Sequence, residues 1–131
     1  MTITGSRLQR VARDAAGALP GVSSGRPFTD KLDVYKVGEK VFLIVTDDPD
    51  ERIITVKSEP DHGRSLQREH ESITPGRYLN KAHWISVAAG REITEGMVED
   101  LVAHSYELVR DSLPRGRRPA GHGSGSRSGK R

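Results

Sequence analysis

The residues best suited to chemistry in this chain lie in one short segment that ends at Trp84. From Pro75 onward it reads Pro-Gly-Arg-Tyr-Leu-Asn-Lys-Ala-His-Trp, so two cations, an amide, an imidazole and two aromatic rings stand close together. Arginine and lysine can contact phosphates, asparagine can bond to a base edge or a sugar, and tyrosine or tryptophan can stack on a base. This combination favours nucleic-acid binding. The candidate contact residues are Arg77, Tyr78, Asn80, Lys81 and His83.

The same side chains also have purely structural interpretations. Trp84 is the only tryptophan, and a large aromatic residue in a strand commonly belongs to the core of a small domain. Asn80 can close a turn, and Tyr78 can anchor the loop. Arg77 and Lys81 can simply be solvated, as most charged side chains are. The sequence leaves both interpretations of this segment open.

The motifs of common enzymes and metal sites are missing. The chain has no glycine-rich phosphate loop, no Gly-x-Ser-x-Gly turn and no His-Glu-x-x-His pair. It has no cysteine, which excludes disulfides and cysteine-based zinc sites. We therefore expect no catalytic residue, no metal site and no cofactor, and we predict that the protein is not an enzyme.

Positive charge is concentrated at the C-terminus. The net charge of the whole chain is +3, but residues 114–131 hold six Lys or Arg and no acid, which leaves residues 1–113 with a net charge of −3. In this tail, Arg115, Arg117 and Arg118 are candidates for sequence-independent contact with phosphates. Ala120 is its only apolar residue, so we expect the tail to be disordered. The alternative is a solubilising extension that has no partner.

Two long helices and a short one are expected to surround a sheet. Residues 4–18 and 95–111 have apolar side chains at the 3.6-residue period of an amphipathic helix, with Thr4 and Thr94 as N-caps. Residues 58–69 predict a shorter helix that Ser58 can cap. Strands are expected at 33–37, 40–46, 52–57 and 83–88, with a turn at 47–50 and a loop or edge segment at 73–76. The fold class is therefore α+β, an antiparallel sheet flanked by an N-terminal helix, a C-terminal helix and a short middle helix.

Two motifs resemble the signature of a known family. The segment from Gly76 to Val87, with its Asn-Lys-x-His-Trp motif, and the Ser-Tyr-Glu-Leu-Val motif at Ser105 to Val109 are similar to those of the MmcQ/YjbR family. The resemblance covers roughly residues 5–114. It implies a domain at 1–113 with a frataxin-like or double-wing fold, in which a sheet and its hairpins approach DNA, and the family is commonly described as DNA-binding.

The frataxin analogy also raises the question of iron. Iron binding requires clustered carboxylates on an exposed helix face. The first helix has Arg7, Arg10 and Arg13 instead, so we expect no iron site.

Two functions of different classes follow. The first is a non-enzymatic DNA-binding protein that contacts phosphates through the Arg77–Trp84 loop and the basic tail. The alternative is a module that binds another protein or a small anion, with the same loop as a pocket rim, which the acidic domain favours. We expect a monomer. We also expect it to be cytoplasmic, because no signal-peptide-like run precedes the domain. No membrane partner is expected, because the longest apolar stretch, Val41 to Val45, is too short to cross a bilayer.

Overall fold

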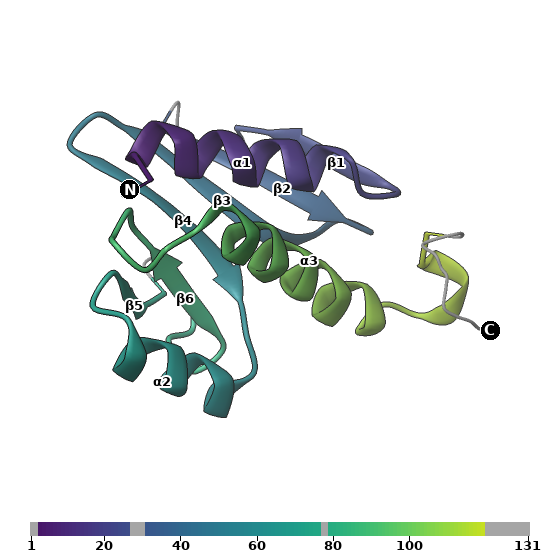
Figure 1. The fold of residues 1–131 in the computed structure, drawn as a ribbon. Coiled ribbons are helices and arrows are strands. Elements are labelled where there is room, and N and C mark those ends of the chain that lie inside the picture. The colour runs from purple at the N-terminus through teal and green to yellow at the C-terminus, as the bar shows by residue number, and fades with distance from the viewer. Residues whose placement is uncertain (1–2, 27–30, 77–78, 120–131) are drawn as a thin grey trace.

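The computed structural model describes residues 3–26, 31–76 and 79–119 and confirms the α+β class (Figure 1). A six-stranded antiparallel sheet has the order β1-β2-β3-β4-β6-β5. The elements are α1 (Gly5–Gly17), β1 (Val22–Gly25), β2 (Leu32–Val37), β3 (Lys40–Asp48), β4 (Glu51–Lys57), α2 (Pro60–Glu69), β5 (Ile73–Pro75), β6 (Trp84–Val87), α3 (Glu95–Asp111) and the short 3-10 helix η1 (Arg115–Arg117).

The helix caps agree with the sequence at two of three positions. Thr4 Oγ1 accepts a hydrogen bond from Arg7 N at 3.0 Å, and Thr94 Oγ1 accepts one from Met97 N at 3.1 Å. The expected cap at Ser58 is wrong, because α2 has Glu59 at its N-cap position and no side-chain cap bond. The Ser58 amide instead donates to His83 O at 2.9 Å, so Ser58 continues the pairing of β4 with β6.

β2, β3 and β4 extend further than the sequence predicted, whereas β6 is shorter than the expected strand at 83–88. β1 was not expected, because Ser-Ser-Gly has little preference for strands, yet its backbone pairs with β2 at the sheet edge. β3 includes Asp47 and Asp48, which were placed in a turn. The edge segment expected at 73–76 is β5, which pairs with β6.

All three helices pack on one face of the sheet, here called the helix face. Its buried strand residues are Leu43, Val45, Ile54, Val56, Ile85 and Val87, which form one core cluster with residues of α1, α2 and α3. Side chains alternate along a strand, so the intervening residues point to the opposite face. The opposite face includes Lys36, Ile44, Thr55, Lys57, Trp84 and Ser86.

A β-bulge at Phe42 joins the sheet to α3. Tyr35 pairs with Leu43 and Lys36 with Val41, so Phe42 is the extra residue. The Ser105 hydroxyl donates to Phe42 O at 2.6 Å and accepts from Lys57 N at 2.8 Å. This hydroxyl therefore bridges the two strands just beyond Leu43 and Val56, where the β3–β4 ladder ends.

The neighbouring Tyr106 holds the core together around this point. Its ring meets Phe42 edge-to-face at 5.4 Å between centroids, and its hydroxyl donates to Pro20 O at 2.7 Å. Burial raises the pKa of Tyr106, so the phenol remains a donor. Ser105 and Tyr106 thus both have core and hydrogen-bonding roles.

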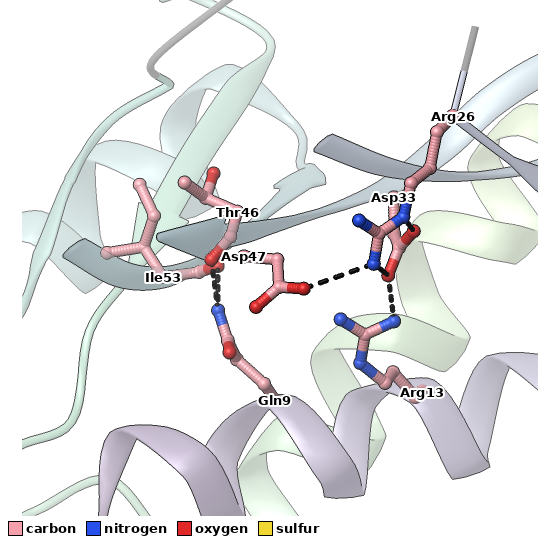
Figure 2. Close-up of polar contacts among 7 residues, drawn as sticks. All are labelled: Gln9, Arg13, Arg26, Asp33, Thr46, Asp47 and Ile53. Atoms are coloured by element: carbon pink, nitrogen blue, oxygen red, sulfur yellow. Dashed lines mark hydrogen bonds and ion pairs between the residues drawn. The ribbon is translucent and has the colours of Figure 1, made fainter. Parts of the chain in front are cut away.

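A polar network fastens α1 to the end of the sheet that holds the β3–β4 turn (Figure 2). Arg13 of α1 and Arg26, which follows β1, both bond to the carboxylate of Asp33, and Arg26 also reaches Asp47 at 3.1 Å. Burial alone would raise the pKa of Asp33, but the hydrogen bonds from the two guanidinium groups outweigh it and hold that pKa below its ordinary value. Gln9 adds bonds to two strand carbonyls, one of them Ile53 O at 3.1 Å.

Ser105→Ala should lower the free energy of unfolding by about 2 to 4 kcal/mol, because a buried carbonyl and a backbone amide both lose their partner. Urea unfolding followed by circular dichroism measures this. Ser112→Ala, at the exposed end of the same helix, is the matched control and should cost under about 1 kcal/mol. Equal losses in the two variants would contradict the role assigned to Ser105.

Asp33→Asn should destabilise the protein by about 1 to 3 kcal/mol at neutral pH, because Arg13 and Arg26 lose a charged acceptor. The folded pKa of Asp33 is lowered, so its contribution is complete above the unfolded pKa, about 4, and is lost as the pH falls through the folded value. The wild-type advantage should therefore shrink below about pH 4. Urea unfolding across this range, with Asp14→Asn as an exposed control on α1, checks it. A difference that does not vary with pH would refute this account.

Candidate nucleic-acid interface

The loop that precedes β6 is held by a compact turn. Asn80 Oδ1 accepts from Ala82 N at 2.8 Å, and Asn80 O accepts from His83 N at 3.1 Å. The structural interpretation of Asn80 as a turn residue is therefore confirmed. Its amide oxygen is occupied by the loop's own backbone, whereas the side chains of Lys81 and His83 are exposed beside it.

Gly76 brings the start of this loop against Trp84. Gly76 N donates to Trp84 O at 2.7 Å, and a Cβ on Gly76 would lie 2.5 Å from Trp84 Cβ. No side chain fits at this position unless the backbone moves. The approach fixes the first turn of the loop relative to β6.

Trp84 does not belong to the buried core. It is only partly buried, whereas Ile85 and Val87 of the same strand are in the core cluster. The interpretation of Trp84 as a core residue is therefore wrong, and the reason is strand alternation, which gives the helix face to Ile85 and Val87. The indole lies on the opposite face of the sheet.

Lys57 is the register partner of Trp84 across β4 and β6 and shares this face. Lys81 and His83 lie in the loop just before Trp84, and Lys81 Nζ donates to Gly76 O at 3.4 Å. Across the described ranges, no carboxylate forms an ion pair with Lys57, Lys81 or His83. The two lysines can therefore meet an external anion without breaking an internal ion pair.

Charged residues gather at both ends of the sheet but are paired differently. β3 begins at Lys40 where β4 ends at Lys57, and the loop before β6 lies at this same end, which we call the basic end (Lys40, Lys57, Lys81 and His83). Two exposed carboxylates, Glu39 and Glu59, also lie there. The opposite end holds the β3–β4 turn, where Asp47 pairs with Arg26 and Asp48 with Lys31.

The arginines after α3 are only partly available. The chain from 114 onward was expected to be disordered, yet Arg115–Arg117 form η1. The correction has a physical cause in Arg118, whose guanidinium donates to Leu113 O at 3.0 Å and Asp111 O at 2.9 Å and so satisfies carbonyls at the end of α3. The Arg118 guanidinium is thus engaged at the end of α3, while Arg115 and Arg117 are exposed.

The chain that enters η1 packs beside the basic end. The buried Leu113 packs on Gly38 in the β2–β3 turn, where a Cβ would meet Leu113 Cδ1 at 2.4 Å. Gly38 has a φ of 56°, which favours glycine in any case. This contact places the start of η1 near the sheet end that bears Lys40.

The remaining predicted contacts are either outside the described residues or engaged elsewhere. Arg77, Tyr78 and residues 120–131 are not described. On α1, Arg7 bonds to Glu95 at 2.7 Å and Arg13 bonds to Asp33, so these arginines do not extend the basic end.

Sequence reasoning missed two sets of residues. The orientation of Lys57 could have been inferred from the sequence, because it lies two residues after Thr55 and so points to the same face, away from the core. The second set, Glu59, His62 and His104, comes together only through the packing of α2 near α3, and no spacing in the sequence indicates it. Across the described residues, no helix combines the length and the apolar character that a membrane span requires.

Comparisons with known proteins agree with this architecture. Residues 17–108 match the model of the YjbR family, a range that includes β6 and the Ser-Tyr motif of α3. The Escherichia coli O157:H7 protein YbdF is 39% identical over 106 residues, which are 81% of this chain and 87% of YbdF. Escherichia coli K12 YjbR is 28% identical over 101 residues, 77% of this chain and 86% of the relative.

Solved structures show the same fold. A Deinococcus radiodurans protein with a DUF419 domain has a TM-score of 0.76 at 28% identity and covers 87% of this chain and 84% of its own. A Pseudomonas syringae protein has a TM-score of 0.64 at 23% identity, over 79% of this chain and 97% of its own, and is similar in fold alone. The matched range, the curated relatives and the shared architecture together make this protein a member of the YjbR family.

Proposed function

We propose that this protein binds DNA without catalysing a reaction, through the basic end of its sheet and the arginines of η1. The observation that carries the proposal is that the partly exposed Trp84 has Lys57 as its register partner and directly follows a loop whose Lys81 and His83 are exposed. Ammonium and guanidinium groups neutralise phosphates, and an exposed indole offers a surface on which a base can stack. Asn80 shapes the loop in this proposal and is not a base contact.

The charge distribution sets how a polyanion approaches. Residues 1–113 carry a net charge of −3, so a uniform domain surface would repel DNA. The basic end instead offers Lys57 and Lys81, which pair with no carboxylate across the described ranges, so DNA is expected to approach at that end. Binding through so few cations is expected to be weak and to depend strongly on salt.

The alternative partner is another protein or a small anion, which the same cations would recognise by charge alone. Such a partner needs no stacking surface beside the lysines. The partial exposure of Trp84 at the basic end therefore favours nucleic acid over a small anion.

Fluorescence anisotropy of labelled duplex and single-stranded DNA, measured against salt concentration, tests the proposal. The chain cut after residue 119 is the right truncation, because Leu113 and Arg118 hold the end of α3. It should still bind, more weakly than the full chain. Lys57→Ala combined with Lys81→Ala should reduce the slope of log affinity against log salt by about 1.8 on B-DNA, since each lost phosphate contact removes about 0.9.

Lys31→Ala is the matched control, because Lys31 is an exposed lysine at the opposite end of the sheet, where it pairs with Asp48. It should leave the slope nearly unchanged. If the chain cut after 119 does not bind, or if Lys31→Ala weakens binding as much as the double variant, the basic end is not the DNA contact. Absence of binding by the full chain would favour the protein or small-anion alternative.

A further inference from the structure

We propose that Glu59, His62 and His104 form a binding site for a divalent transition-metal ion of the zinc class. One potential ligand atom from each residue lies within 4.8 Å of the other two. None of the three is a proposed DNA contact, although Glu59 lies at the basic end; the cluster joins α2 to α3.

The three side chains converge from two helices. Glu59 is the N-cap residue of α2 and His62 lies in its first turn, while His104 projects from α3. His104 Nε2 lies 3.4 Å from Glu59 Oε1, and the two imidazole rings are 5.7 Å apart between centroids at an angle of 80°.

His104 Nε2 has the character of an unused ligand atom. It is shielded from solvent and makes no hydrogen bond to any residue that the structure describes, although Glu59 is near. Buried polar atoms are nearly always satisfied in folded proteins. A metal ion that accepts the lone pair of this nitrogen would satisfy it.

Two imidazoles and a carboxylate are a donor set that suits zinc. Zinc bonds of about 2.0–2.2 Å place tetrahedral ligand atoms roughly 3.4 Å apart. Glu59 and His62 are exposed, so small side-chain rotations can close the present spacing. Three protein ligands leave a coordination position for water or another ligand.

A groove of about 670 Å³ supplies space for that position. His62 and His104 line it together with Leu66, Met97 and Asp100. Asp100 lies one helical turn before His104, so both are on the same side of α3. Its carboxylate is placed to orient a metal-bound water or to act as an additional ligand.

A bridging ion would change how α2 is held. In the fold, α2 packs mainly on β5 and β6, and the cluster lies between α2 and α3. An ion that binds only the folded arrangement stabilises it by mass action. The melting temperature should therefore rise as zinc is added.

Isothermal titration calorimetry of the full chain with Zn²⁺ tests the proposal, with Mg²⁺ as a hard-ion comparison. We expect one Zn²⁺ per chain and no comparable binding of Mg²⁺. His62→Gln and His104→Gln should each weaken Zn²⁺ binding at least about tenfold, since even loss of an outer-shell partner has an effect of this size. His83→Gln, which changes a described histidine outside the cluster, should bind Zn²⁺ as the wild type does.

Two further measurements keep the test decisive if His104→Gln does not fold. Glu59→Gln alters an exposed side chain and should remove most of the zinc-dependent rise in melting temperature. Co²⁺ should give visible absorption typical of four or five ligands in the wild type, and this should be lost in His62→Gln. The proposal is overturned if zinc binds equally well to His62→Gln and Glu59→Gln, or if the wild type binds none.

Discussion

The rest of the fold depends on the hydroxyl of Ser105. The bulge at Phe42 lies in the β2–β3 ladder, and the β3–β4 ladder ends one residue away at Leu43 and Val56, where this hydroxyl bonds to Phe42 O and Lys57 N. It therefore sets the position of α3 on the sheet and fixes the backbone of Lys57 at the end of β4. Because Lys57 pairs with Trp84, the same interaction determines where the basic end presents its cations beside the indole. A packing requirement of the core thus controls the geometry of the surface.

The helix dipoles explain the positions of some charged residues but not of all. Arg7 near the start of α1 pairs with Glu95 at the start of α3, and the Tyr106 hydroxyl of α3 donates to Pro20 O just after α1. The two helices therefore run side by side in one direction (Figure 1). Carboxylates near helix N-termini and cations near C-termini are stabilising, which accounts for Glu95 and Arg118. Lys57 and Lys81 are not at a helix C-terminus, so helix dipoles give no structural reason for them.

Much of the fold could be predicted from the sequence because local signals agree with the packing. α3 begins after Thr94 and ends at Asp111 as its apolar period and cap indicate. The weakly strand-forming Val22–Gly25 could not be predicted, because β2 supplies its hydrogen bonds. The site was harder still. Its loop was identified from composition, but the exposure of Trp84 and the capping by Arg118 depend on strand alternation and on contacts formed only in the folded chain.

The central claim is that the indole of Trp84 and the lysines beside it form the surface that meets DNA. Trp84 is the only tryptophan, so its indole N–H gives a single side-chain resonance in a ¹⁵N-labelled sample. Titration with a short DNA strand should shift that resonance together with the amides of Lys57 and residues 79–83. If DNA binds while these signals stay unchanged and shifts appear only elsewhere in the chain, the assignment of the contact surface is wrong.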